Sequence, residues 1–303
     1  MIDISHKSKT LRTATARARV TASPKTLAAI RDRAVPKGDP LEVAKVAAVQ
    51  AVKSTSQIIP YCHPLAIDFA GVEFELGQGS IEVRCTVKAI DKTGVEMEAL
   101  TGAAVAALTL YDMLKMLDDT MVIEQVALVE KKGGKSDFVN EPPTPLRAAV
   151  LVMSDSVAAG RATDSSGLLI AETLRKQGVE VADYRIVPDD LDAIVAAVTD
   201  YADRRALDLV LTTGGTGLGP RDCTPEAMSR LIEREAPGIV EAARAHGQQR
   251  TPYSMLSRGR AGLRGKTLIV NLPGSKRAVA ESLAALFPGL LHAFKMLRAS
   301  GHG

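Results

Sequence analysis

A glycine-rich segment, Leu211 to Pro225, holds the residue types best suited to phosphate chemistry. It follows an apolar run, Leu207 to Leu211, which predicts a buried strand, so the glycines fall where the chain must turn sharply. Backbone N–H groups at such a turn are unshielded by side chains and can wrap phosphate oxygens. Arg221 adds a fixed cation, and Asp222 a carboxylate suited to Mg²⁺. The three glycines of this turn are Gly214, Gly215 and Gly217.

A tight strand-to-helix turn without any ligand would also explain these glycines. The Arg221-Asp222 pair argues against that alternative, because a purely structural turn needs no charge pair at its exit. Thr224 and Pro225 predict an N-cap followed by proline at the first helical position. A second helix N-terminus would then face the same spot, which favours anion binding.

The first half has its own polar residues where a fold alone would not require them. Lys37 stands directly before a predicted helix start, so its ammonium group and the helix dipole could hold an anion together. Asp112 and Lys115 lie three residues apart on one face of a predicted helix, Glu98 to Leu117, where a solvated ion pair is the alternative. The remaining candidates are Cys62, His63, Glu96, Met97 and Glu98.

Polar residues also follow the predicted strands of the second half. Ser154 and Asp155 come after its first strand, Asp189 after its second, and Ser275 after a later one. The carboxyl ends of parallel strands meet at one edge of a sheet, where ligands bind. Asp189 is therefore a candidate ligand-binding residue, although it could instead cap the helix that follows it.

The two halves differ in the order of their predicted elements. The first reads strand, helix, strand, strand, helix, strand, which predicts an α+β ferredoxin-like domain. From Arg147 onward strands alternate with helices, which predicts an α/β three-layer domain with a mostly parallel sheet. Three prolines within four residues predict an extended linker between them. We expect domains over residues 1–138 and 147–303, joined by a linker at 139–146.

Composition excludes several classes of function. Aromatic residues make up 3% of the chain and there is no Trp, which disfavours recognition of nucleic acid by base stacking. A net charge of +3 is too small to predict a nucleic-acid or membrane partner, and no apolar run approaches membrane-spanning length. Cys62, Cys85 and Cys223 are far apart, without the spacing typical of zinc sites or disulfide frameworks. We expect a cytoplasmic protein.

Four motifs of the first half resemble the MoaC family, the cyclic pyranopterin monophosphate synthases of molybdenum-cofactor biosynthesis. The likeness covers about Met1 to Phe138. It implies a ferredoxin-like subunit in dimers grouped as a hexamer, a pocket at a subunit interface and no cofactor. The substrate would be the cyclised dihydro-GTP intermediate, rearranged to the pyranopterin cyclic phosphate with loss of pyrophosphate. The motifs are Lys37-Gly38-Asp39, Ile59 to Leu65, Thr93 to Thr101, and Tyr111 to Lys115.

By that resemblance Lys37 and Lys115 occupy the family's catalytic positions and Asp112 is the helix carboxylate. A triphosphate has to be held by cations, and the purine-to-pterin rearrangement requires proton transfer by groups tuned near neutrality. A lysine beside another cation, or partly desolvated, would have a lowered pKa and could transfer protons. The residues that would line the pocket are Cys62, His63, Glu96, Met97 and Glu98.

The second half resembles the molybdopterin adenylyltransferase family of MogA and MoaB, over about Arg147 to Arg298. By that resemblance Mg²⁺-ATP and molybdopterin meet at the loops, AMP passes to the terminal phosphate of the pterin, pyrophosphate leaves, and the domain forms trimers. Asp222 would be the essential metal or positioning carboxylate, and Asp189 would be the second acidic residue and a second candidate metal ligand. Gly214, Gly215, Thr216 and Gly217 would cradle the nucleotide phosphates, with Arg221 as the nucleotide-binding cation. Ser154 and Asp155 would bind substrate, and Ser275 would be part of the pterin side. The motifs are Ser154-Asp155, Ile186 to Asp189, Thr213 to Asp222, Thr224 to Glu226, Ile232 to Gly238, and Asn271 to Ser275.

The sequence therefore predicts a bifunctional enzyme. The alternative is that the second half binds or scaffolds a pterin without transferring AMP. Because a trimer and a trimer of dimers can share one three-fold axis, we expect a homo-oligomer with three-fold symmetry, a hexamer or a trimer. Cys223 lies inside the nucleotide motif, where we expect it to have a packing role.

Overall fold

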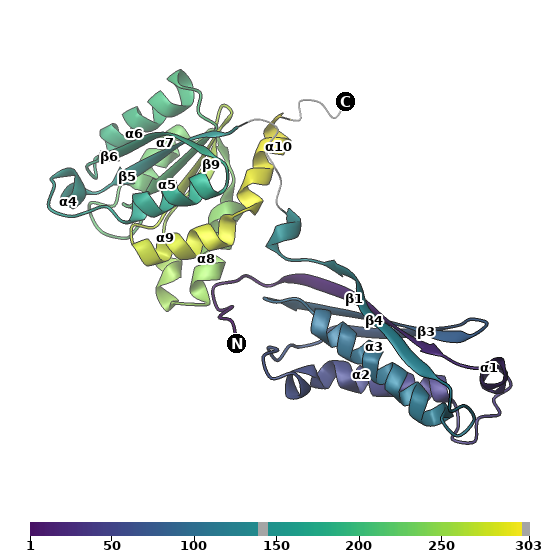
Figure 1. The fold of residues 1–303 in the computed structure, drawn as a ribbon. Helices are drawn as coiled ribbons and strands as arrows, with labels where there is room; N and C mark the ends of the chain where they lie inside the picture. The colour runs from purple at the N-terminus through teal and green to yellow at the C-terminus, as the bar shows by residue number, and fades with distance from the viewer. Residues whose placement is uncertain (139–144, 299–303) are drawn as a thin grey trace. The chain divides into compact units, whose positions relative to one another are not determined.

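The computed structural model describes residues 1–138 and 145–298 and divides into two compact units, Met1–Asp137 and Phe138–Gly303 (Figure 1). Each unit has its own hydrophobic core among the described residues. Most of the expected linker, residues 139–144, lies outside the described part of the chain.

The first unit is a four-stranded sheet with helices on one face. Its strand order is β2-β3-β1-β4, and every neighbouring pair is antiparallel. The helices α2 and α3 pack side by side against the sheet (Figure 1). The elements are β1 (Thr10–Thr21), α1 (Pro24–Arg31), α2 (Pro40–Ile58), β2 (Phe69–Leu76), β3 (Ser80–Asp91), α3 (Glu96–Leu114), β4 (Val122–Lys132) and the 3-10 turn η1 (Lys135–Phe138).

Small side chains build this core in place of aromatic ones. Alternate residues of β1 point inward, and alanines line the contact between α2 and α3. A Cβ atom at Gly102 of α3 would lie 2.7 Å from Sγ of Cys85 and 2.7 Å from Cγ2 of Val52, so the helix approaches β3 and α2 as closely as glycine allows. The expected start of α2 is confirmed, because Oδ1 of Asp39 accepts hydrogen bonds from the backbone N–H groups of the first turn.

The expectation that no run reaches membrane-spanning length is wrong for α3. Among the described residues, α3 is long and apolar enough to cross a membrane by length and composition, with a mean hydropathy of 1.2. Half of it is buried inside the first unit, against α2, β1 and β3. Such burial is what the core helix of a globular domain has, and it accounts for the apolar character of this helix.

The second unit confirms the expected mostly parallel sheet. Its strand order is β6-β5-β7-β10-β9-β8. The first four strands are parallel to one another, and β9 pairs in antiparallel fashion with both β10 and β8. One cluster of buried residues packs α5, α8, α9 and α10 against one face, and a second packs α6 and α7 against the other (Figure 1). The elements are β5 (Arg147–Met153), α4 (Asp155–Ala158), α5 (Ser166–Lys176), β6 (Glu180–Val187), α6 (Leu191–Thr199), the π turn η2 (Asp200–Arg204), β7 (Leu209–Thr213), α7 (Thr224–Leu231), β8 (Arg234–Glu235), α8 (Pro237–Gln248), η3 (Pro252–Leu256), β9 (Ala261–Arg264), β10 (Thr267–Leu272), α9 (Lys276–Leu286), η4 (Gly289–Leu291) and α10 (His292–Arg298).

Candidate active sites

A carboxylate between two lysines lies at the C-terminal end of α3. Nζ of Lys37 donates to Oδ2 of Asp112 at 2.9 Å and to its backbone carbonyl at 2.7 Å. Nζ of Lys115 lies 2.8 Å from Oδ1 of the same carboxylate. These contacts with Lys115 and Lys37 lower the pKa of Asp112 to about 2. The structure thus brings the three residues together, although they are far apart in sequence.

The expectation of a lysine with a lowered pKa is wrong for Lys115. Its hydrogen bond to Asp112 and the charge of that carboxylate raise the pKa of the ammonium group instead. Lys115 is therefore a lasting cation at neutral pH. Such a group can hold phosphate oxygens, but it is a poor proton acceptor.

The other candidates of the first half line a separate cavity of about 790 Å³ at the N-terminal end of α3. Glu98 is buried there, and burial, together with the charge of Glu96, raises its pKa. Burial and the charge of Glu98 also raise the pKa of the Cys62 thiol. Nε2 of His63 donates to the backbone carbonyl of Ile2 at 3.0 Å. The lining residues include all five that the sequence singled out, Cys62, His63, Glu96, Met97 and Glu98.

The N-terminal segment forms another wall of this cavity. Met1, Ile2, Ile4 and Lys7 all line it. Sequence reasoning missed this contribution, because the segment forms no helix or strand and carries no periodic pattern.

The lysine cluster and the cavity lie at opposite ends of one helix. Glu96 is the first residue of α3, and Asp112 lies sixteen positions later in its last turn. At about 1.5 Å per residue, that separation is about 24 Å along the helix axis. Neither Asp112 nor its two lysine partners line the cavity. A single copy of the chain therefore does not bring the candidates of the first half into one site.

In the second half, carboxylates and a cation meet where the parallel strands end. The backbone N–H of Asp155 donates to Oδ2 of Asp189, and that of Asp189 donates to Oδ1 of Asp155, both at 3.1 Å. Nη2 of Arg221 lies 2.7 Å from Oδ2 of Asp155. Burial raises the pKa of Asp189, and the nearby charges of Asp155 and Asp222 raise it further. The helix cap proposed as the alternative role for Asp189 is wrong, because Asp190 caps α6.

The glycine turn fits tightly against these groups. Gly214 and Gly215 have φ angles of 105° and 58°, which favour glycine. A Cβ atom at Gly215 would lie 3.1 Å from Oδ1 of Asp189 and 2.4 Å from Oγ1 of Thr224. The expected N-cap role of Thr224 is wrong, because its hydroxyl donates instead to the carbonyl of Gly214 at 3.0 Å. This hydrogen bond ties the start of α7 to the turn.

Asp222 closes the far side of the same loop. Its Oδ2 accepts a hydrogen bond of 2.7 Å from the backbone N–H of Gly219. No group of three or more His, Cys, Asp or Glu side chains within residues 1–138 and 145–298 could hold a metal ion on its own. Asp222 is near enough to Asp189 for its charge to raise the pKa of that carboxyl, and Mg²⁺ is a cation that proteins hold through one or two carboxylates together with substrate phosphates and water.

Arg258 holds the loop in place, and sequence reasoning missed it. Its Nε donates to the carbonyl of Gly217 at 2.7 Å, its Nη2 to the carbonyl of Asp222 at 2.6 Å, and its backbone N–H to the carbonyl of Thr216 at 2.8 Å. The guanidinium also pairs with Glu226 of α7. Arg258 lies in a connection without regular structure, so no pattern in the sequence pointed to it.

Two cavities border the glycine loop. One of about 370 Å³ is lined by Ser154, Gly214, Gly215 and Ser275, together with Asp164 and Lys276. Another of about 430 Å³ lies beside Asp222 and is also lined by Cys223 and Arg258. The candidates from β5, β6, β7 and β10 therefore gather at one edge of the sheet.

Comparisons with known proteins agree with this division. Residues 1–134 match the MoaC family, and residues 149–292 match the probable molybdopterin binding domain. The chain is 44% identical over its whole length to the molybdenum cofactor biosynthesis bifunctional protein of Chlorobaculum tepidum, covering 96% of that protein. The chain belongs to this bifunctional family.

Each half of this bifunctional molybdenum cofactor biosynthesis protein is also similar, by itself, to other proteins. A cyclic pyranopterin monophosphate synthase of Pelobacter propionicus is 55% identical over 138 residues, which are 45% of this chain and 86% of that protein. The second half is similar to the molybdopterin biosynthesis enzyme MoaB from Thermus thermophilus, whose crystal structure matches with 46% sequence identity and a TM-score of 0.49. The match covers 51% of this chain and 98% of the MoaB chain.

Proposed function

We propose that the first half of this molybdenum cofactor biosynthesis enzyme converts the cyclised GTP-derived intermediate into cyclic pyranopterin monophosphate and pyrophosphate, and that the second half transfers AMP from Mg²⁺-ATP to molybdopterin. Each half would be a domain, over residues 1–138 and 147–303, and the protein would act in the cytoplasm without nucleic-acid or membrane partners. The strand order of the first unit and its two-helix layer support a ferredoxin-like domain.

In the first reaction the lysine cluster would hold the triphosphate. Asp112 keeps the ammonium groups of Lys37 and Lys115 side by side against their mutual repulsion. Both remain partly exposed, so phosphate oxygens can reach them and the charge of departing pyrophosphate is stabilised. Proton transfer would fall to the cavity, where burial raises the pKa of Glu98 above its usual value.

The distance along α3 requires two copies of the chain for this reaction. The lysine cluster would hold the triphosphate end of the substrate while the cavity holds the ring end, and a rigid helix keeps Glu96 and Asp112 about 24 Å apart, which is farther than one substrate molecule reaches. The lysine cluster of one copy would therefore complete the cavity of another. This composite site supports the proposed pocket at a subunit interface.

In the second reaction the glycine turn would hold the phosphates of ATP. Gly214 and Gly215 adopt positive φ angles beside Asp189, at the carboxyl end of β7, and this arrangement is the observation that carries the proposal. Mg²⁺, when bound by Asp189 and Asp222, supplies charge neutralisation at the reacting phosphate. Arg221 would exchange its partner Asp155 for a phosphate oxygen.

One experiment tests both activities in the full chain. Purified protein is incubated with the cyclised intermediate, and separately with Mg²⁺-ATP and molybdopterin. We expect Lys115→Ala to abolish only the first product and Asp222→Ala only the second. If the wild-type chain makes the pyranopterin but leaves molybdopterin without AMP, the transferase proposal is wrong and the second half is a pterin-binding module.

A further inference from the structure

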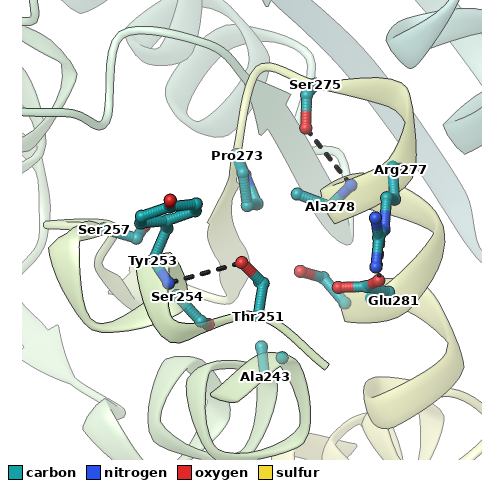
Figure 2. Close-up of a pocket in the computed structure, with 12 residues that line it drawn as sticks. Ala243, Thr251, Tyr253, Ser254, Ser257, Pro273, Ser275, Arg277, Ala278 and Glu281 are labelled. Atoms are coloured by element: carbon teal, nitrogen blue, oxygen red, sulfur yellow. Dashed lines mark hydrogen bonds and ion pairs between the residues drawn. The ribbon is translucent and has the colours of Figure 1, made fainter. Parts of the chain in front are cut away.

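A pocket of about 260 Å³ lies between α8, η3 and α9, and Figure 2 shows the side chains around it. Ser275 lines this pocket and also the cavity of about 370 Å³ beside the glycine turn. The hydroxyl of Ser275 accepts a hydrogen bond of 3.3 Å from the backbone N–H of Ala278 and so caps α9 (Figure 2). The pocket therefore belongs to the proposed site of AMP transfer. A buried group to which neither reaction assigns a role lies instead in the first unit.

This group is the carboxylate of Asp118, which lies just beyond the lysine cluster in sequence and is only 7% exposed. Its Oδ2 accepts hydrogen bonds from the backbone N–H of Ser23 at 2.7 Å and from the hydroxyl of Thr26 at 3.1 Å. Its Oδ1 accepts hydrogen bonds from the backbone N–H of Thr120 at 3.0 Å and from the hydroxyl of the same residue at 2.7 Å. These hydrogen bonds, with that from Ser23 first, hold the pKa of Asp118 well below its usual range. The carboxylate is therefore ionised at neutral pH.

Asp118 joins two segments that are far apart in sequence. Ser23 is the N-cap of α1 and Thr26 lies in its first turn, so Oδ2 binds the start of α1. The position favours a negative charge, because the free N–H groups of a helix point outward at its N-terminus. The backbone N–H of Asp118 donates to the carbonyl of Leu114, the last residue of α3, at 3.2 Å. The start of α1 is thus tied to the end of α3 through one residue.

Each of these two segments leads to one lysine of the cluster. Lys115 follows α3 directly, in the stretch that Asp118 closes. Lys37 follows α1 through a short connection held by backbone hydrogen bonds, one of which runs from the N–H of Gly38 to the carbonyl of Val35 at 3.1 Å. Val35 is itself buried in the core of the first unit. A shift of α1 against α3 would therefore be passed on through this connection and change the separation of the two ammonium groups.

We infer that Asp118 is a positioning residue for pyranopterin formation, because it fixes α1 against the end of α3 and so holds Lys37 and Lys115 at the separation that a phosphate chain requires. The inference rests on the proposed role of the lysine cluster in the first reaction and deepens it. The ion pairs of Asp112 with the two lysines do not fix this geometry by themselves. Their side chains are between 32% and 59% exposed, and exposed ion pairs are weak.

Inhibition of pyranopterin formation by inorganic tripolyphosphate tests the inference in the full chain. This probe has no ring, so its inhibition constant reports how well the cations hold a phosphate chain. We expect Asp118→Asn to raise this constant, and KM for the cyclised intermediate, about tenfold, because the charge that binds the start of α1 is lost. Thr26→Val removes one of the two contacts with α1 and should raise both constants by a smaller factor. Hydrogen exchange of residues 24–38 should accelerate in both variants.

Two control variants separate positioning from a general loss of stability. Thr55→Val removes a hydroxyl as buried as that of Thr26, but its hydrogen bonds stay within α2. Ile81→Val removes a methyl group from the core at β3 and should lower Tm. Lower stability reduces the amount of folded enzyme and leaves the constants of the folded molecules as they were. Both controls should therefore keep the wild-type inhibition constant and KM.

Unchanged constants in Asp118→Asn would overturn the inference, even with faster exchange of residues 24–38, because α1 would then have loosened without any effect on the lysines. An equal rise in either control would overturn it as well. If Asp118→Asn does not fold, the comparison of Thr26→Val with Thr55→Val decides in the same way.

Two further variants separate this failure from failure of the proposed function. If Lys37→Ala and Lys115→Ala keep wild-type pyranopterin formation, the proposed role of the lysine cluster is wrong and the inference falls with it. If they abolish the product while Asp118→Asn keeps the wild-type constants, the role of the cluster stands and only the assignment of Asp118 is wrong.

Discussion

At the scale of single residues, Asp112 offsets the repulsion between two ammonium groups that lie close together. Its carboxylate separates the ammonium groups of Lys37 and Lys115, and both contacts favour its ionised form. We expect Asp112→Asn to lower pyranopterin formation about 100-fold or more, because the lysines would repel each other away from the phosphates. The measurement is kcat of the first reaction, with AMP transfer as an internal reference.

The matched control is Asp119→Asn, which changes an exposed carboxylate just beyond the same helix and should leave kcat unchanged.

The pH dependence of the effect of Asp112 provides a second check. A lowered folded-state pKa means that the stabilising effect of Asp112 is complete above the usual carboxyl pKa of about 3.9 and is lost as the pH falls toward about 2. If activity were instead lost near neutral pH because Asp112 takes up a proton there, this assignment would be contradicted.

The contribution of Glu98 to stability should change with pH in the opposite direction to that of Asp112. Burial raises its pKa, so its ionised form is disfavoured in the fold, and the stability that its protonated form contributes is lost as the pH rises through the raised pKa. We therefore expect Glu98→Gln to match or exceed wild-type thermal stability at pH 8 while abolishing pyranopterin formation. We also expect the acid limb of the wild-type pH–rate profile to lie above the usual glutamate pKa of about 4.3. Lower stability of the variant at pH 8 would show that its carboxylate is needed for folding.

At the scale of elements, Arg258 makes a loop without regular structure act as a rigid part of the site. Its three hydrogen bonds join both ends of the stretch from Thr216 to Asp222. Arg258→Lys keeps the charge but loses the forked geometry, so we expect kcat for AMP transfer to fall about 100-fold. Hydrogen exchange of residues 216–222 should accelerate at the same time.

Arg230→Lys is the control for this prediction, since Arg230 is a largely exposed residue of α7 that pairs only loosely with Asp192, at 3.8 Å. A lower kcat in Arg258→Lys without faster exchange of the loop would mean that Arg258 contacts the nucleotide itself. In that case it would be a catalytic residue and no longer a positioning one.

The elements that the sequence predicted well are those with a local signal. Asp39 and Pro40 marked the start of α2, and the apolar runs of the second half marked its parallel strands. The strands β8 and β9, of two and four residues, are too short for any periodic pattern, and the nearby α8 was not assigned. In the second half, the positions of the strand ends predicted which candidate site residues lie close together. In the first half, the sequence did not predict this, because the length of α3 separates residues whose proposed roles belong to one reaction.

At the scale of the whole molecule, the two reactions place different demands on assembly. The candidate residues of AMP transfer gather within one copy of the second unit, at the edge formed by β5, β6, β7 and β10. The candidates of pyranopterin formation are separated by α3 in one copy of the first unit, and the proposed composite site brings them together only when copies associate. Pyranopterin formation should therefore depend on subunit association, whereas AMP transfer need not.

Mixing two inactive variants tests this dependence. Lys115→Ala keeps Glu98, and Glu98→Gln keeps Lys115, so a mixed pair has one site with both residues intact and one with neither. If subunits exchange at random, half of the pairs are mixed, and the mixture should recover about a quarter of wild-type pyranopterin formation. Each variant alone should remain inactive, and a mixture of Lys115→Ala with Asp112→Asn should too, because both substitutions fall in the same cluster. A site contained within one copy would leave every mixture inactive, provided that mass spectrometry shows that the subunits have exchanged.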